Sequence, residues 1–253
     1  MKVFLAASTT GITKADREIV IRKNPPKYLL ETFYSGTSKC DKVLADVSVD
    51  NFLLDSGAFT FMHTKTNVTG KEIDYYTDQL IDYIKTRGIK YFFEMDIESI
   101  LGLKKVEELR YHIEQKTGQQ CIPVWHKERG IQYFKWMTKN YRYIAIGGMV
   151  VGRNRPITAL SKMVKYAKDR GVKVHGLGFT DLTHLNSIDW YSVDSCSWVK
   201  SAVRGGRVHR FTRTTIKAEP VKKNGFKLNL SKLSMNNFNE WIKFQKYMDT
   251  RSW

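Results

Sequence analysis

Short β-branched or aromatic runs alternate with segments of helical periodicity along most of this chain, and this alternation constrains its fold more than any other feature. The clearest unit starts with a strand at 52–54. It continues into a helix that opens at Thr69-Gly-Lys-Glu72, which has capping-box spacing, and ends near Gly88. The next strand is expected at 90–95. A repeated strand–helix order predicts a parallel sheet covered by helices.

Eight strand segments can be placed in this way. They are expected at 2–6, 52–54, 90–95, 121–125, 143–146, 173–177, 190–193 and 207–211. Further helices are expected near 102–117, 129–139, 157–170 and 181–188. Eight strands with crossover helices in 253 residues match the size of a (β/α)8 barrel, so we predict a single-domain α/β protein with a TIM-like barrel. A doubly wound open sheet is the alternative, because periodicity does not show closure.

Two stretches interrupt the alternation. Residues 9–50 contain Pro25-Pro26 and an amphipathic piece at 28–33, and we expect them to form an insertion that caps the barrel or extends a binding surface. Residues 200–232 hold ten Lys and Arg against one acidic residue, Glu219. We therefore assign 1–211 to the barrel and 212–253 to a basic extension that ends in a closing helix packed on the barrel.

The charge balance indicates the class of partner. The chain carries 42 Lys and Arg against 25 Asp and Glu, a formal net charge of +17. Such an excess attracts polyanions, so nucleic acid is the predicted partner, well ahead of an anionic membrane surface. No apolar run reaches the roughly 20 residues of a membrane helix. Three cysteines without CxxC spacing argue against a disulfide framework or a zinc module, and we expect a soluble cytoplasmic protein without a metal or cofactor.

Polar residues and glycines recur where the predicted strands end. Three of these residues are aspartates, at positions 55, 96 and 194, and the others are His126, Gly147, Gly148 and His175. In a βα barrel the strand ends lie on one face, where catalytic groups collect. A lone aspartate in such a place is more often a helix cap or a turn residue. Three of them at three strand ends favour a site.

Five segments resemble the motifs of the tRNA-guanine transglycosylase superfamily, in the same order and spacing. They are Asp55-Ser-Gly-Ala-Phe59, Phe92-Phe-Glu-Met-Asp96, Ile144-Ala-Ile-Gly-Gly148, His175-Gly-Leu-Gly178 and Val193-Asp-Ser-Cys196. The zinc site that the tRNA enzymes carry after the nucleophile, Cys-x-Cys-x-x-Cys plus His, is missing here. The chain is therefore most similar to the compact, zinc-less 7-deazaguanine DNA transglycosylases of phages and bacterial DNA-modification clusters.

The resemblance implies the exchange of guanine in DNA for a 7-deazaguanine base, such as 7-cyano-7-deazaguanine. It implies that Asp194 is the nucleophile of a covalent glycosyl intermediate and that Asp55 acts as acid and then base. Asp96 matches the residue that reads the ring NH and amino group of the purine. The resemblance also implies that Phe59 and His175 sandwich the base and that Gly147 and Gly148 let the backbone approach it.

One strand end departs from the family pattern. Its Gln-Gly-Gly is replaced by Val124-Trp-His126, and we favour His126 over Trp125 as the residue that faces the base and tunes the accepted 7-substituent. After the nucleophile, Arg204-Gly-Gly-Arg207 is the predicted centre of a phosphate track, because glycines let the backbone lie close to phosphates. The basic residues of this track are Lys200, Arg204, Arg207, Arg210 and Arg213.

A free 7-deazaguanine base is the expected co-substrate, and a homodimer or a partner protein is left open. Three other functions compete with the DNA transglycosylase. The first is a zinc-independent tRNA-guanine transglycosylase, and the second is a non-catalytic nucleic-acid-binding subunit of the same fold. The third is an unrelated barrel hydrolase, which would release base or cut strands rather than leave an intact strand with a substituted base.

Overall fold

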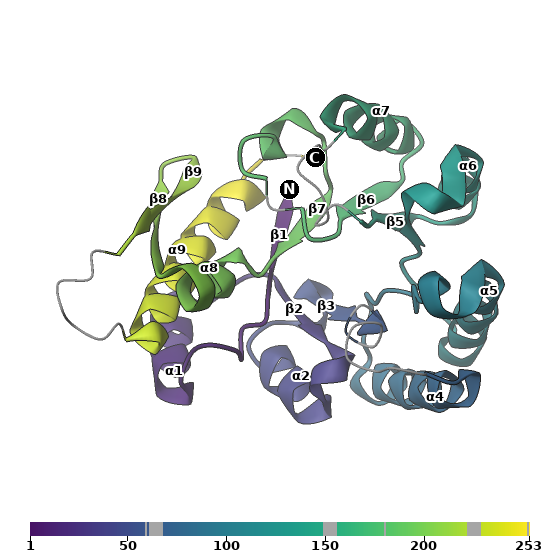
Figure 1. Ribbon diagram of the computed structural model, residues 1–253, viewed down its shortest axis with the longest axis horizontal. Helices are drawn as coiled ribbons and strands as arrows, with labels where there is room; N and C mark the ends of the chain where they lie inside the picture. Colours follow the sequence, from purple (N-terminus) through teal and green to yellow (C-terminus); the bar gives the residue numbers. More distant parts are fainter. Residues whose placement is uncertain (59, 61–67, 149–155, 180, 222–228, 252) are drawn as a thin grey trace.

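Parallel strands alternate with helices in the structure, a computed structural model that describes residues 1–58, 60, 68–148, 156–179, 181–221, 229–251 and 253. The strands are β1 (Lys2–Ala6), β2 (Leu29–Thr32), β3 (Phe52–Asp55), β4 (Val124–Trp125), β5 (Tyr143–Ile146), β6 (Lys173–Gly176), β7 (Ser192–Ser195), β8 (Arg207–Thr212) and β9 (Thr215–Pro220). The helices are α1 (Lys14–Lys23), α2 (Thr37–Leu44), α4 (Gly70–Arg87), α5 (Glu98–Thr117), α6 (Gly130–Asn140), α7 (Ile157–Lys168), α8 (Ser197–Gly205) and α9 (Leu230–Asp249). Figure 1 shows the helices arranged around the strands.

The main sheet closes into a ring. Seven parallel strands pair in the order β3-β2-β1-β7-β6-β5-β4. The gap between β3 and β4 is filled by a short extended segment, in which Phe92 bridges Leu54 of β3 and Phe93 bridges Ile122 just before β4. Around the ring, eight strand segments follow one another in chain order. The predicted α/β barrel in a single domain is confirmed, and the open doubly wound sheet is not what forms.

The ring interior is filled with side chains, as expected of a small barrel. Inward-facing residues from six strand segments pack together there, namely Phe4, Leu30, Leu53, Phe93, Ile122, Val124 and Ala145. Their chain neighbours point outward into a larger apolar layer between the sheet and the helices. On β3, for example, Phe52 and Leu54 face the helices while Leu53 faces the interior. Period-two alternation therefore directs the next residue, Asp55, toward the barrel axis.

Local signals in the sequence define the helices well. The capping box at Thr69 and Glu72 forms as predicted, and α4 ends on Gly88 in a left-handed conformation with φ 60°. The buried face of α4 includes Ile73, Leu80 and Ile84, which pack into the outer apolar layer. In the described part of the chain, no helix is both long and apolar enough to cross a membrane.

Three predicted elements are corrected by the structure. Residues 29–32, which we placed inside an insertion over 9–50, form barrel strand β2 between β1 and β3. Residues 207–211 do not form a barrel strand, because β8 pairs with β9 in a separate antiparallel hairpin. The helix expected at 181–188 is reduced to a single 3-10 turn at Leu185–Ser187.

The closing helix α9 packs against the barrel as predicted. Its buried residues include Phe238, Trp241 and Phe244, and the amide of Gln245 donates to the carbonyl oxygens of Val3 and Tyr28 at 2.7 Å each. The amino group of Met1 donates to the carbonyl of Met248 at 3.1 Å. The C-terminal end of α9 therefore lies at the amino-terminal end of the barrel strands (Figure 1).

The β8–β9 hairpin lies along α9. The backbone N–H of His209 donates to Asn237, and Phe211 stacks against Phe244 and Tyr247 farther along the helix. Strand β8 thus runs in the same direction as α9, toward the amino-terminal end of the barrel. The hairpin turn at Arg213 therefore lies away from the carboxyl-terminal face of the barrel, where the strand ends collect.

Candidate active site

The three predicted aspartates all come from carboxyl ends of barrel strands. Asp55 is the last residue of β3, Asp96 follows the bridging segment at Phe93, and Asp194 is the third residue of β7. Asp194 pairs in register with Phe4 of β1, whose side chain belongs to the interior cluster. The charges of Asp96 and Asp194 both act on Asp55. The structure therefore gathers the three carboxyl groups at one mouth of the barrel.

Two contacts fix one oxygen of Asp194. Its Oδ1 accepts a hydrogen bond from the backbone N–H of Gly178 at 2.5 Å and lies 3.2 Å from Nε2 of His175. Among the described residues, no hydrogen bond reaches Oδ2. The carboxyl group is nearly buried, with 9% of the residue exposed. Asp194 is thus held by one oxygen and presents the other.

Asp55 has the properties of a group that exchanges protons near neutral pH. Burial raises the pKa of its carboxyl to about 7, and the nearby charges of Asp96 and Asp194 add to this. The backbone N–H of Gly57 donates to its Oδ1 at 3.0 Å and partly offsets the rise. Gly57 has φ 84°, and a Cβ there would lie 2.6 Å from Cβ of Tyr34, so glycine is required in this turn.

Asp96 is paired with His126, the residue favoured at the departing strand end. His126 Nε2 lies 3.1 Å from Asp96 Oδ2. Burial alone would lower the pKa of His126, but the carboxylates of Asp96 and Glu98 outweigh it and raise it above its usual value. Trp125 points outward instead, since its indole N–H donates to the carbonyl of Gly130 and its ring packs on Phe134. Trp125 is thereby turned away from the mouth, and His126 as the residue that faces a base stays a prediction.

A buried network of ion pairs lies next to the Asp96–His126 pair. Arg129 donates two hydrogen bonds to Glu98, at 3.0 and 2.6 Å, and a third to Glu94 at 2.7 Å. Arg110 donates to the other oxygen of Glu94 at 2.9 Å. Glu94 is fully buried, and its Oε1 also accepts from the backbone N–H of Val124. The network ties the helix that follows Asp96 to the strand end that carries His126.

The two glycines after β5 have different roles. A Cβ on Gly147 would lie 2.5 Å from Cε1 of His126, so this glycine leaves room for the imidazole. Gly148 has φ 74°, a conformation that side chains disfavour. Their approach to a base edge stays a prediction.

Phe59 and His175 are the two residues expected to stack on the base. Phe59 lies outside the described residues. His175 is fully buried, and its ring lies against Phe4 and Phe93 at centroid distances of 6.2 and 5.2 Å. Stacking of His175 on a base stays a prediction. In this structure its nitrogens contact Asp194 and Ser192.

The predicted phosphate track is divided between two elements. Lys200 and Arg204 are exposed on α8, which begins directly after β7, and the indole N–H of Trp198 in its first turn donates to the carbonyl of Ala6 at the end of β1. Arg210 and Arg213 are exposed on the hairpin, which extends toward the amino-terminal face. Arg207, between the two groups, is also exposed. Lys200 and Arg204 thus belong to the helix that starts at the mouth carrying the carboxyl groups.

Four residues of the site were not singled out from the sequence. Tyr143 and Ser192 extend the contacts of His175, while Glu98 and Arg129 support His126. A signal existed for Ser192, because it stands two residues before Asp194 on a strand and so faces the same way. Glu98 and Arg129 follow the strand-end residues Asp96 and His126 by two and three positions.

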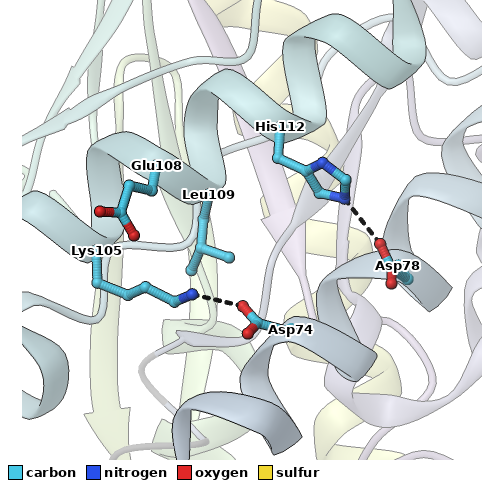
Figure 2. A pocket seen from close by; sticks show the side chains of 6 residues that line it. All are labelled: Asp74, Asp78, Lys105, Glu108, Leu109 and His112. Atoms are coloured by element: carbon cyan, nitrogen blue, oxygen red, sulfur yellow. Dashed lines mark hydrogen bonds and ion pairs between the residues drawn. The ribbon is translucent and has the colours of Figure 1, made fainter.

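A hollow on the outer wall of the barrel differs in its lining from the mouth at the strand ends (Figure 2). Figure 2 shows Lys105 and His112 of α5 reaching toward α4, where they pair with Asp74 at 2.6 Å and Asp78 at 2.8 Å. Glu108 and Leu109 complete the lining. Three of the six lining residues are acidic, and all six come from helices rather than strand ends. Catalytic groups of a βα barrel collect at the strand ends, so we locate the candidate site there.

Comparisons with known proteins support the fold. No family model and no curated protein matches the chain. Among solved structures, the YdjI aldolase from Escherichia coli K12 matches with a TM-score of 0.53 and 11% identity, covering 98% of this chain and 90% of that one. An aldolase named QR15 matches with a TM-score of 0.49 and 12% identity, covering 77% and 88%. KGPDC from Streptococcus mutans matches with a TM-score of 0.44 and 11% identity, covering 96% and 97%. None of these three is named as a transglycosylase. At 11% identity the likeness to the YdjI aldolase shows the fold alone, and we draw no argument from the two matches with lower TM-scores.

Proposed function

We propose that this protein is a base-exchange transglycosylase that replaces guanine in DNA with a 7-deazaguanine base such as 7-cyano-7-deazaguanine. The observation that carries the proposal is that the carboxyl groups of Asp194 and Asp55 are held in different surroundings. Asp194 is fixed through Oδ1 and presents Oδ2, whereas Asp55 has a pKa raised to about 7. Two carboxyl groups held in different environments are what a glycosidic exchange needs, one as nucleophile and the other as acid and base.

The carboxyl groups of Asp194 and Asp55 are sufficient for the exchange. Oδ2 of Asp194 attacks the anomeric carbon C1′ of the target nucleotide, and the bond from C1′ to the purine breaks as the ester bond forms. Asp55 gives its proton to the departing purine and becomes a carboxylate. It then takes the ring N–H proton of the incoming base. The freed nitrogen attacks C1′ and displaces Asp194, so both carboxyl groups return to their starting states.

Asp96 and His126 would select the base. A carboxylate accepts two hydrogen bonds from the adjacent ring N–H and amino group that guanine and its deaza analogues share, and adenine lacks this pair of donors. The Asp96–His126 pair, 3.1 Å apart, stands at the same mouth as the two reacting carboxyl groups. Oδ1 of Asp96 has no hydrogen bond from a described residue and is the oxygen available to a base. His126 is the neighbouring donor that a substituent or a ring oxygen would meet.

The charge of the chain supports a nucleic-acid substrate. The net charge is +17, and the exposed residues Lys200 and Arg204 lie on α8, the helix that follows Asp194. A stacked guanine cannot reach groups inside a barrel mouth, so the nucleotide must be extruded from a duplex or presented in a single strand. DNA is preferred over tRNA because the zinc module of the tRNA enzymes is absent from the sequence.

The test is a base-exchange assay. The protein is incubated with isotope-labelled guanine or 7-cyano-7-deazaguanine and with duplex DNA, single-stranded DNA or tRNA, and the nucleosides are then analysed by mass spectrometry. We expect labelled base in intact DNA, no incorporation by Asp194→Asn, and unchanged incorporation by Asp78→Asn, which alters a carboxyl group on the outer wall. Incorporation into tRNA alone identifies the tRNA enzyme. Free base or cut strands without incorporation identify a hydrolase, and binding without any reaction identifies a non-catalytic subunit.

A further inference from the structure

A hydrogen-bonded column crosses the barrel interior and ends on Asp194. Tyr143 at the start of β5 contacts Ser192 at the start of β7, with 2.6 Å between their hydroxyl oxygens. Ser192 Oγ lies 2.7 Å from His175 Nδ1, and His175 Nε2 lies 3.2 Å from Asp194 Oδ1. The cross-strand pairing of His175 with Ser192 sets this arrangement. Three neighbouring strands therefore contribute to a single chain of contacts.

The chemistry of the column fixes its direction. A carboxylate oxygen only accepts, so the hydrogen must be on Nε2 of His175. A neutral imidazole then has its lone pair on Nδ1, which makes Ser192 the donor to that nitrogen. The oxygen of Ser192 in turn accepts from the hydroxyl of Tyr143. Burial raises the pKa of Tyr143 well above its usual value, so this hydroxyl stays a donor across the neutral range.

Packing holds the column in one position. His175 and Ser192 are fully buried, and the imidazole is enclosed by Phe4 and Phe93. The Tyr143 ring contacts Tyr91 and Tyr191 edge-on, at centroid distances of 6.1 and 5.3 Å. Each buried nitrogen and oxygen of the column has a partner, which is what a buried polar chain needs in order to be stable. The imidazole therefore has little freedom to turn.

We infer that Tyr143, Ser192 and His175 are positioning residues, which select the Nε2–H tautomer of His175 and thereby hold Asp194 Oδ1 so that Oδ2 meets the sugar. The inference rests on the proposed function, because it assigns these residues to the nucleophile of that reaction. In this role all three act through Asp194 and not through a contact of their own with the substrate. Loss of the column should slow formation of the covalent intermediate more than it weakens DNA binding.

The tautomer can be tested without any activity. The nitrogen-15 spectrum of histidine-labelled protein at pH 8 is recorded for the unmodified chain and for Tyr143→Phe, Ser192→Ala and Tyr191→Phe, and the His175 signals are assigned from their loss in His175→Gln. We expect a neutral imidazole with its hydrogen on Nε2. Ser192→Ala should shift the Nδ1 signal or mix the tautomers, Tyr143→Phe should shift it less, and Tyr191→Phe should leave it unchanged. A hydrogen on Nδ1 of the unmodified chain, or a cationic ring, overturns the inference.

The rate of the first step supplies the second readout. Single-turnover formation of the DNA adduct should fall roughly tenfold in Ser192→Ala and roughly a hundredfold in His175→Leu, because small displacements of a reacting group have effects of this size. DNA affinity should change less than twofold. His175→Gln should retain more activity than His175→Leu, since its amide can still donate to Asp194. Equal rates in Ser192→Ala and the unmodified chain overturn the inference, whereas a correct tautomer with no adduct in any variant counts against the proposed function alone.

Discussion

Gly147 and His126 occupy complementary space, since a Cβ built on the glycine would lie 2.5 Å from Cε1 of the imidazole. The imidazole in turn lies 3.1 Å from Asp96. The glycine at the end of β5 therefore determines where the candidate base-reading pair stands. This relationship crosses from the end of β5 to the end of β4, and it links the motif that contains Gly147 to the strand end that departs from the family pattern.

The Gly147→Ala substitution should reduce exchange by displacing His126 from Asp96. We expect kcat/KM for guanine exchange to fall roughly tenfold or more, because the closest obstruction is the His126 imidazole, and we expect the fold to be retained, because the contact with core residue Val124, at 2.9 Å, is only slightly too short. The control repeats the kcat/KM measurement in a His126→Ala background. The imidazole is absent there, so the added methyl group should reduce kcat/KM much less. Equal losses in both backgrounds would show that Gly147 acts through something other than His126.

Asp55 should make the protein less stable as the pH rises. Between pH 4 and about 7 the folded chain binds a proton at Asp55 that the unfolded chain has released, so the free energy of unfolding falls over this window and is level above it. A pKa raised from 3.8 to about 7 corresponds to about 4 kcal/mol at most. Urea unfolding should find Asp55→Asn more stable than the unmodified chain by about 2–4 kcal/mol at pH 8 and nearly equal to it at pH 4.5. A constant difference at both pH values contradicts the raised pKa.

The ion network under His126 should be costly to break. Arg129→Met leaves Glu94 fully buried with one cation fewer and removes both hydrogen bonds to Glu98. We expect a loss of about 3–5 kcal/mol in the free energy of unfolding. The matched control is Arg87→Met, which removes a similar two-bond pair with Asp41 on the exposed surface and should leave stability nearly unchanged. Similar losses from both variants would show that burial does not set the cost.

The basic residues should differ in their contribution to DNA binding. Lys200 and Arg204 are exposed on α8, which begins directly after β7, so we expect Lys200→Ala and Arg204→Ala each to reduce the slope of log affinity against log salt by about one. Arg213 lies at the hairpin turn toward the opposite face, and Arg213→Ala should change the slope less. Fluorescence anisotropy with a labelled oligonucleotide over a salt series measures these slopes. A larger effect from Arg213 than from Arg204 would move the DNA path onto the hairpin.

The sequence predicted the barrel because local signals agree with its topology. Strands such as β5 and helices such as α4 carry clear periodicity and caps. Strand β2 was missed because parallel barrel strands are buried on both faces, and the short run at 28–33 reads equally well as an amphipathic piece. The segment that forms β8 has strand character but pairs with β9, and no local pattern shows which partner a strand will take.

The site followed from the sequence in part. Strand-end positions predicted Asp55, Asp96 and Asp194, because parallel strands bring their carboxyl ends to one face. The preference for His126 depended on which of two adjacent residues points inward, and the contact of the Trp125 indole with Gly130 leaves His126 on the inner side, while its contact with a base stays a prediction. Tyr143 and Ser192 were missed because the contact of Tyr143 with Ser192 and that of Ser192 with His175 depend on the register between β5, β6 and β7, which is set by packing across strands.

The most direct test of the central claim is to trap the covalent intermediate on Asp194. The protein is mixed with an oligonucleotide that contains one guanine, without an incoming base, then denatured and analysed by intact and peptide mass spectrometry. We predict a DNA-linked protein whose adduct maps to Asp194, disappears on a chase with 7-cyano-7-deazaguanine and does not form in Asp194→Asn. An adduct on Asp55 or Cys196, or one that persists in Asp194→Asn, contradicts the assignment of the nucleophile.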